Sequence, residues 1–418
     1  MGSEWDLMPS KIKQLNRSFS GSHCSQLKLG HFHHFLLFIV GLSLGIIFIY
    51  ITSFWLLAIN VPAPAFIKPL IPLLPDHRDL LERGHLLFPS RLQEWSRGTN
   101  DTIPDHHDSV PVSKEKVSLV HNMSDDELLR RAAMVQGQEF SDGSIVPKVA
   151  FMFLTYGPLH LSPVWEKFFI GHEGFYSVYW HARPSYNDAM PEDSVFYGTR
   201  IPSQEVKWGT SSMMDAERRL LANALLDPSN LRFILLSESC IPLFDFKTIY
   251  NYLVNTNLSL QASFDHPRKN ARGRYNPQMA PTINVTNWRK GSQWFELRRD
   301  LAHQVIADQK YYPIFQEFCH PPCYVDEHYI PTLLNILQPS LNSNRTVTWV
   351  DWSRDGPHPR KFGWDDMTDE FLDKIRYGSN CTYSGKSTTM CFLFARKFLP
   401  STLEQLLRIL PVLLGLDP

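Results

Sequence analysis

The stretch LRFILLSES (231–239) joins an almost unbroken apolar run to a polar end. A short apolar run with polar boundaries predicts a strand that is buried on both faces of a sheet. Two similar runs precede it, KVAFMFLT (148–155) and FYSVYWHA (175–182). Directly before the third run, SSMMDAERRLLANALL (211–226) has apolar residues at helical spacing. Strands that alternate with helices predict an α/β fold with a mainly parallel central sheet.

In such a sheet, ligands bind beyond the carboxyl ends of the strands. Polar residues follow each of the three predicted strands, and their shared position predicts one cleft lined by Thr155, Tyr156, His181, Arg183, Ser237 and Glu238. The sequence has neither a GxGxxG nor a Walker loop, which argues against a dinucleotide or ATP site. A formal net charge of −1 argues against a nucleic-acid partner, because nucleic-acid-binding proteins usually carry a basic excess.

Residues 35–59 contain no charged side chain. A helix needs about 20 apolar residues to cross a bilayer, whereas the apolar core of a cleaved signal peptide has about 7–15. The segment therefore predicts a retained transmembrane signal anchor. Lysine and arginine residues before it predict a cytosolic tail over 1–34 and a lumenal remainder. Proline-rich and polar sequence predicts a stem over 60–147, and the folded domain is expected over 148–418.

Asparagine sequons on the predicted lumenal side fit this single-pass type II topology. They are the candidate N-glycosylation sites Asn100, Asn122, Asn257, Asn284, Asn344 and Asn380.

Five cysteines follow the predicted anchor, in what is expected to be an oxidising compartment. Proximity in the sequence predicts the disulfides Cys319–Cys323 and Cys381–Cys391, with Cys240 free in apolar surroundings. A zinc site is the alternative, but the spacing does not match a tight CxxC pair.

Two groups of residues are candidates for binding sugar or acceptor. The basic loop DHPRKNARGRY (265–275) contains Arg272 and Arg274, which are either simply exposed or bind an anionic ligand such as a diphosphate. Trp349 and Trp352 lie among polar residues, where a tryptophan is either half-buried core or a platform for a sugar ring. Both alternatives remain open for each group, and Glu238 joins them as a further acceptor-side candidate.

Five segments together resemble one known family. They are LLSESCIPL (235–243), KGSQWFELRR (290–299), CYVDEHYIPTLL (323–334), TWVDW (348–352) and CFLFARKF (391–398). In this order and spacing, between about residues 148 and 399, they resemble the core-2/I-branching β-1,6-N-acetylglucosaminyltransferases of glycosyltransferase family 14, in particular the plant subgroup. The resemblance implies a GT-A-like nucleotide-sugar transferase fold and a Golgi membrane location.

The resemblance also implies a reaction, the inverting transfer of a sugar from a UDP-sugar to a glycan, proteoglycan or cell-wall polysaccharide. No metal or other cofactor is expected, and the catalytic region contains no D-x-D triplet. The family's catalytic base falls on Glu327, with Asp326 as an orienting neighbour. The simpler alternative is that both acids only stabilise the N-terminus of a helix.

Without a metal, the departing diphosphate needs cationic side chains. The resemblance assigns this role to Lys397, with Arg396 beside it. The family's arginine before the last motif's cysteine is missing, and Lys386 is the cation that the segment offers instead. This departure keeps a second hypothesis open, a carbohydrate-binding or scaffold protein of the secretory pathway with weak or no activity. A hydrolase that uses Glu327 with Asp351 is a third.

Overall fold

The structure is a computed structural model that describes residues 119–135, 146–354, 356 and 358–415. These residues all lie within one compact unit, 110–418. The predicted tail, the predicted anchor and most of the predicted stem lie outside the described residues and stay predictions. Among the residues that are described, no helix is long and apolar enough to cross a membrane.

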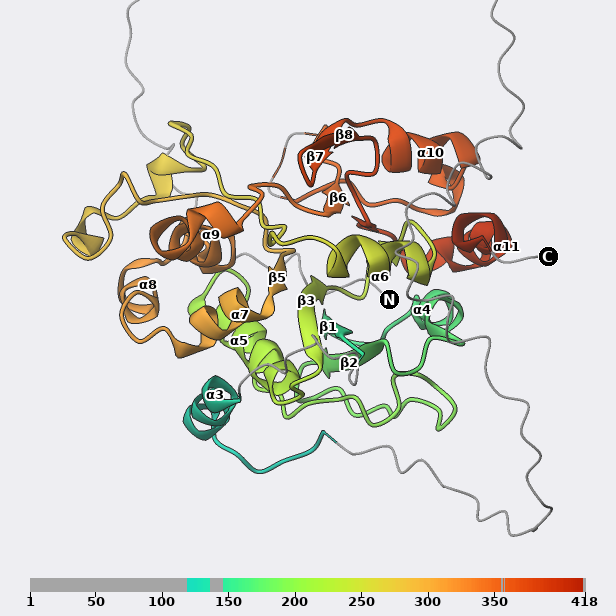
Figure 1. Cartoon of the computed structure of the whole chain (residues 1–418), viewed down its shortest axis with the longest axis horizontal. Coiled ribbons are helices and arrows are strands. Elements are labelled where there is room, and N and C mark those ends of the chain that lie inside the picture. The colour runs from blue at the N-terminus through green and yellow to red at the C-terminus, as the bar shows by residue number, and fades with distance from the viewer. Residues whose placement is uncertain (1–118, 136–145, 355, 357, 416–418) are drawn as a thin grey trace, which may run out of the picture. The chain divides into compact units, whose positions relative to one another are not determined.

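The central sheet has the strand order β2-β1-β3-β5 (Figure 1). Its strands are β1 (Lys148–Leu154), β2 (Tyr176–His181), β3 (Asn230–Leu236) and β5 (Glu296–Arg298). β1 pairs in parallel with β2 and β3, whereas β5 adds an antiparallel edge. The mixed α/β class and the mostly parallel sheet are thus confirmed, and the arrangement is consistent with the expected GT-A-like fold. The antiparallel edge was not predicted.

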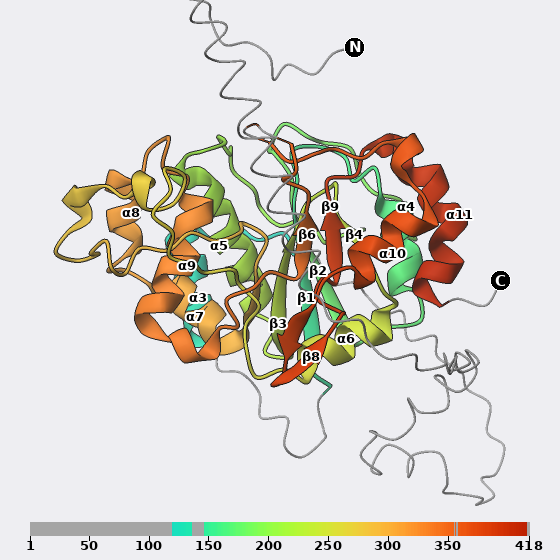
Figure 2. The same ribbon diagram turned by 90° about the horizontal axis from the view of Figure 1, so that it is seen from above.

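Successive residues of β1 face two different cores, because strand side chains alternate. Phe151 and Phe153 pack with one hydrophobic cluster, and Ala150 and Met152 pack with the other. This burial on both faces explains why the strand sequences are continuously apolar. Helices cover both faces of the sheet, as Figure 2 shows.

The first cluster includes residues of α4 (Ser162–Phe169), α6 (Phe246–Val254), α10 (Asp369–Tyr377) and α11 (Leu403–Leu414). The second includes residues of α3 (Asp125–Met134), α5 (Ser211–Leu225), α7 (Arg299–Ala307), α8 (Tyr312–Phe318) and α9 (Val325–Leu337). The predicted helix at 211–226 is therefore α5, one residue shorter at its end.

A second sheet has the order β4-β9-β6 and carries the C-terminal motif. Its strands are β4 (Ile241–Pro242), β6 (Thr348–Val350) and β9 (Phe394–Arg396). β9 is the central strand, antiparallel to β4 and parallel to β6. β7 (Cys381–Tyr383) and β8 (Lys386–Thr388) form a separate antiparallel hairpin.

Helix α3 falls in the range predicted as stem, yet it packs against α5 and α7. Ser124 caps it by accepting a hydrogen bond from the Glu127 amide at 3.3 Å. The Glu127 side chain pairs with Arg131. Asp125 accepts two hydrogen bonds from Arg219 of α5, at 2.7 and 2.6 Å. This segment of the predicted stem therefore belongs to the folded unit.

Candidate active site

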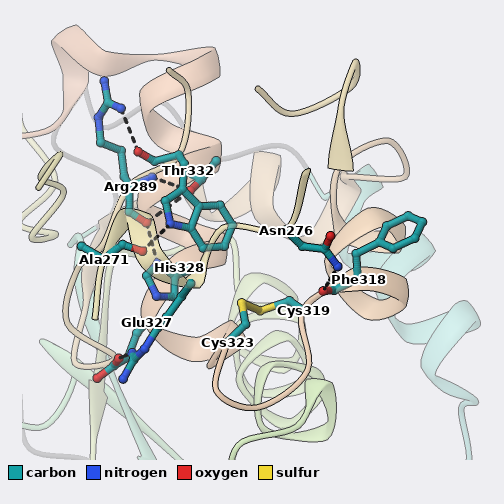
Figure 3. The surroundings of a disulfide bond; sticks show 11 residues. Ala271, Asn276, Arg289, Phe318, Cys319, Cys323, Glu327, His328 and Thr332 are labelled. Carbon is teal, nitrogen blue, oxygen red and sulfur yellow. Dashed lines mark hydrogen bonds and ion pairs between the residues drawn. A yellow bond between two sulfur atoms is a disulfide. The ribbon is translucent and has the colours of Figure 1, made fainter. Parts of the chain in front are cut away.

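The predicted catalytic acids lie in the first turn of α9, which begins at Val325. The disulfide Cys319–Cys323 closes the turn just before this helix, and Figure 3 shows it beside Glu327. The structure contains this disulfide and Cys381–Cys391, the two pairs predicted from proximity. Cys240 is free and buried, also as predicted.

Glu327 is held by two cations. Its Oε2 atom accepts a hydrogen bond from Lys290 Nζ at 2.7 Å and another from Arg274. Within the described part of the chain, no hydrogen bond reaches Oε1, and the side chain is 24% exposed. Burial acts to raise the pKa of Glu327, but Lys290 and Arg274 outweigh it and leave the pKa below its ordinary value. Glu327 is therefore an ionised carboxylate with one oxygen fixed and the other available.

Asp326 lies in a different environment. Its side chain is buried, and its Oδ1 atom has no hydrogen-bond partner among the residues that the structure describes. Burial, together with the neighbouring charge of Glu327, raises the pKa of Asp326 to about 7. Glu217 of α5 is also fully buried and accepts a hydrogen bond from Gln293 at 3.0 Å. Burial and Asp326 raise the pKa of Glu217 as well. The structure shows no bond from the Asp326 side chain to Glu327, so its orienting role stays a prediction.

Asp326→Asn is expected to change how stability depends on pH. The folded pKa of about 7 lies above the ordinary 3.8, so the wild type loses stability as pH rises across this interval. The neutral variant lacks that loss and should gain on the order of a few kcal/mol over the wild type between pH 5 and 7.5. Thermal unfolding at both pH values measures this, with the exposed Asp373→Asn as control. Equal pH slopes for Asp326→Asn and wild type contradict it.

Close backbone packing brings Lys290 to Glu327. The Gly291 amide donates to the Glu327 carbonyl at 2.8 Å, and Lys290 and Phe264 exchange two backbone hydrogen bonds of 2.9 Å. A Cβ at Gly291 would stand 1.9 Å from the Ala262 carbonyl oxygen. Only glycine permits this approach. The segment 262–264 and the residues around Lys290 therefore reach the start of α9 together.

His328, which is fully buried, holds residues 288–289, directly before Lys290. Its Nδ1 atom lies 2.8 Å from the Arg289 carbonyl oxygen, and its ring stacks on Trp288 at 4.5 Å between centroids. Burial lowers the pKa of His328 to about 3, so the ring is neutral. The Arg289 amide donates to Thr332 Oγ1 at 3.0 Å, one turn along α9 (Figure 3).

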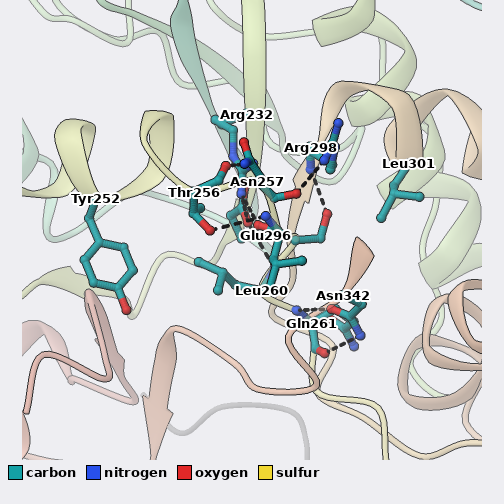
Figure 4. Close-up of polar contacts among 12 residues, drawn as sticks. Arg232, Tyr252, Thr256, Asn257, Leu260, Gln261, Glu296, Arg298, Leu301 and Asn342 are labelled. Atoms are coloured by element: carbon teal, nitrogen blue, oxygen red, sulfur yellow. Dashed lines mark hydrogen bonds and ion pairs between the residues drawn. The ribbon is translucent and has the colours of Figure 1, made fainter. Parts of the chain in front are cut away.

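A buried ion pair holds the chain that leads to the basic loop. Arg232 and Glu296 are 2% and 0% exposed, and their side chains meet at 2.7 Å (Figure 4). Arg232 also donates to the Leu258 carbonyl at 2.7 Å, and Glu296 accepts from the Leu260 amide at 3.1 Å. The terminal nitrogens of Arg232 therefore have partners nearby, although its Nε atom and Glu296 Oε1 have none among the described residues, and the charge within LRFILLSES is buried as part of an ion pair. The network joins β3 and β5 to the segment that continues into residues 265–275.

Arg272 and Arg274 of the basic loop have different partners. Arg272 pairs with Asp265 on the surface, whereas Arg274 pairs with Glu327 and lies 4.6 Å from the centre of the Tyr324 ring. Arg274 is therefore placed at the candidate base, and Arg272 is not.

The residues at the carboxyl ends of the parallel strands fall into a buried group and an outer group. Thr155 accepts from Trp180 Nε1 at 2.8 Å, and Ser237 is bonded to Ser239 at 3.0 Å. His181 is fully buried, and burial lowers its pKa to about 4. These three serve internal packing. On the outer side, Arg183 lies over the Tyr156 ring at 4.3 Å.

Arg396 is the last residue of β9, and Lys397 directly follows it. Burial lowers the pKa of both, and the charge of Glu238 acts in the opposite direction on each. Arg396 also lies 3.9 Å from the centre of the Trp294 ring. Glu238 is therefore placed near the cationic pair predicted to bind the leaving group.

Lys386 lies elsewhere. Its hairpin packs on α6, where the Tyr383 hydroxyl donates to the Tyr252 carbonyl at 2.8 Å. Tyr252 is near the C-terminal end of α6, and no interaction joins Lys386 to Lys397 in the described residues. The arrangement does not bring Lys386 to the other predicted diphosphate ligands.

The two candidate tryptophans, Trp349 and Trp352, differ in burial. Trp349 is half-buried and packs on Phe362 and Phe371, which favours the core alternative for it. Trp352 is 56% exposed, so the sugar-binding alternative stays open there.

Sequence reasoning missed several residues of the site. Lys290 is the first residue of the family segment KGSQWFELRR, which could have suggested a role in the site. The neighbouring sequence, however, does not predict its contact with Glu327. Trp208, 46% exposed, contacts the rings of Tyr324 and His358 at 5.0 and 5.6 Å between centroids. These aromatic contacts join the start of α9 to the segment after β6.

All described sequon asparagines are exposed, namely Asn122, Asn257, Asn284, Asn344 and Asn380. Asn100 lies outside the described residues. In the described ranges, no cluster of three or more histidine, cysteine, aspartate or glutamate residues is arranged to hold a metal ion.

Comparison with known proteins places this geometry in a family. The family model for the core-2/I-branching enzyme (Branch) matches residues 149–376 of the 418-residue chain. The chain therefore belongs to the core-2/I-branching enzyme family of glycosyltransferases, and the resemblance seen in the sequence is confirmed. The chain is also similar to glycosyltransferase BC10 of Oryza sativa subsp. japonica. The two are 37% identical over 298 residues, which cover 60% of this chain and 73% of the relative.

Proposed function

We propose that this protein transfers a sugar from a UDP-sugar to a glycan or polysaccharide acceptor, with inversion at the anomeric carbon and without a metal. Glu327 takes the proton of the acceptor hydroxyl as its oxygen attacks the anomeric carbon. The bond to the diphosphate oxygen breaks, and UDP leaves with the electron pair. A positioned base of this kind contributes about 10²–10⁴ to the rate.

The environment of Glu327 carries the proposal. A carboxylate used only to stabilise a helix N-terminus needs no partner beyond the helix itself. Here two cations bind one oxygen, and their charges keep the group ionised although it is largely buried. Such a carboxylate is oriented and ready to accept a proton through its other oxygen.

Arg396 and Lys397 support the second half of the reaction. Both are cationic side chains at the end of β9, held in place by a strand that pairs on both sides. Fixed cations stabilise charge that develops on a leaving group without any reorganisation during the step. We assign these two side chains to the donor diphosphate.

The reaction is tested by incubating the full chain with a panel of UDP-sugars in excess EDTA and measuring UDP release with and without glycan acceptors. Release from one donor that rises with acceptor, together with NMR of the product linkage, supports the proposal and identifies the sugar. No release with any donor, if glycan arrays still show binding, favours the scaffold hypothesis. Release that requires an added divalent cation contradicts the metal-free mechanism.

Lys290→Met is expected to move the acid limb of the pH–rate profile to higher pH. Lys290 lowers the pKa of Glu327, and the base works only above that pKa. Without Lys290 the pKa rises, so activity is lost earlier as the pH falls. The profile of kcat/KM against pH measures the shift, with Lys374→Met as the control. An unchanged acid limb in Lys290→Met contradicts this role.

We also propose that the protein is a single-pass type II membrane protein of the Golgi. The uncharged segment 35–59 and the exposed sequon asparagines support this. Peptide N-glycosidase F should lower the apparent mass of the chain isolated from membranes, and an unchanged mass counts against lumenal exposure.

A further inference from the structure

The segment after β6 runs directly beside the residues that follow β9. The Phe362 amide donates to the Lys397 carbonyl, and the Leu399 amide donates to the Phe362 carbonyl, both at 2.9 Å. Phe362 and Phe398 form a parallel β-bridge. The backbone of Lys361 is therefore fixed next to that of Lys397, although the two residues come from different segments of the chain.

The direction of the side chains follows from this pairing. Phe362 and Phe398 both point into the first hydrophobic cluster, with ring centroids 5.5 Å apart. In extended chains, adjacent residues point to opposite faces. Lys361 and Lys397, each directly before one of these phenylalanines, consequently share the opposite face. Lys361 is exposed there and Lys397 is partly buried.

This face carries two lysines that form no ion pair in the part of the chain that the structure describes. Neither lysine has an acidic partner within 4 Å in the described residues, and Glu238 is the acid whose charge reaches Lys397. Burial and the charges of Lys397 and Lys361 lower the pKa of His358. Two lysine side chains thus extend from paired backbone segments to one face, just after the strand that carries Arg396.

We propose that Lys361 binds the diphosphate of the nucleotide-sugar donor together with Lys397. This inference rests on the proposed function and adds a phosphate-binding residue that lies outside the five family segments. The diphosphate supplies the anionic partner that the paired lysines lack. Lys361 acts as a point charge on a flexible side chain, so it needs no bidentate geometry. It provides a further cation near Lys397 in addition to Arg396, whereas the hairpin that contains Lys386 provides none.

The test compares the binding of UDP and UMP by the full chain in detergent, using isothermal titration calorimetry. A lost charge-assisted contact costs about 1.5–3 kcal/mol, so Lys361→Met should weaken UDP binding about ten- to a hundredfold. UMP has no β-phosphate, and its affinity should change much less. Lys361→Arg should retain UDP binding. Lys374→Met, which removes an exposed lysine of α10, should match the wild type.

The outcomes distinguish a failure of the Lys361 role from a failure of the proposed function. A wild type that prefers UDP to UMP, combined with unchanged UDP affinity in Lys361→Met, overturns the role of Lys361 and leaves the proposed function standing. Equal weakening of UDP and UMP also overturns it, because the defect is then not at the diphosphate. A wild type that binds no UDP overturns the proposed function and this inference together.

Discussion

Glu327→Gln is expected to lower the rate of sugar transfer about 10²–10⁴-fold, since an amide cannot take the acceptor proton. Glutamine keeps the size of the side chain and an oxygen that can still accept from Lys290. The donor should therefore bind almost normally, and the loss should fall on kcat. Product formation at saturating donor and acceptor, followed by chromatography, measures it.

The control is Asp373→Asn, which neutralises an exposed carboxylate of α10 and should leave the rate unchanged. Thermal unfolding of both variants shows whether the fold persists, because Glu327→Gln leaves the charges of Lys290 and Arg274 without their anionic partner. A folded Glu327→Gln protein with wild-type transfer would show that another group is the base.

Gly291→Ala is expected to destabilise the fold by about 3 kcal/mol or more, at the upper end of overpacking effects. The added Cβ would stand 1.9 Å from the Ala262 carbonyl oxygen and 2.6 Å from Pro331 Cγ. Backbone cannot yield as a flexible side chain does, so the segment must move away from α9. The melting temperature should fall by about 10 °C, and activity should fall with it because Lys290 moves too.

Gly157→Ala is the matched control, because a Cβ at that position meets nothing within 4 Å. It should melt like the wild type. A Gly291→Ala protein with the same melting temperature as Gly157→Ala contradicts the close approach of this segment to α9.

The central strands could be predicted because their signal is local. Each is a continuous apolar run, and burial on both faces demands such a run. β5 could not be predicted, since it has only three residues and its pairing with β3 depends on the buried contact between Glu296 and Arg232. The short strands of the second sheet have the same limitation. Their partners are distant in the chain, and three residues carry no periodicity.

The residues of the site likewise fall into those that a local segment predicts and those that depend on tertiary packing. Asp326 and Glu327 stand in one recognisable segment, so a sequence can nominate them. Their different environments depend on what packs around α9, and adjacent acids therefore differ in pKa in a way that no local pattern shows. Arg274 and Arg272 are two residues apart and have different partners for the same reason. Lys361 had no motif around it and is placed only by the backbone pairing with Lys397.

The central position of β9 has a consequence for the order in which the molecule is made. Its partners β4 and β6 leave the ribosome earlier, and both stay without their shared neighbour until residues 394–396 follow. Lys397 comes immediately afterwards, so the second sheet and the cationic end of the site are completed in one late event. A chain that stops before residue 394 therefore exposes unpaired strand edges and lacks these cations. We expect incomplete products to be recognised by the cell's quality control through these edges, and the same products lack the cations proposed to bind the diphosphate.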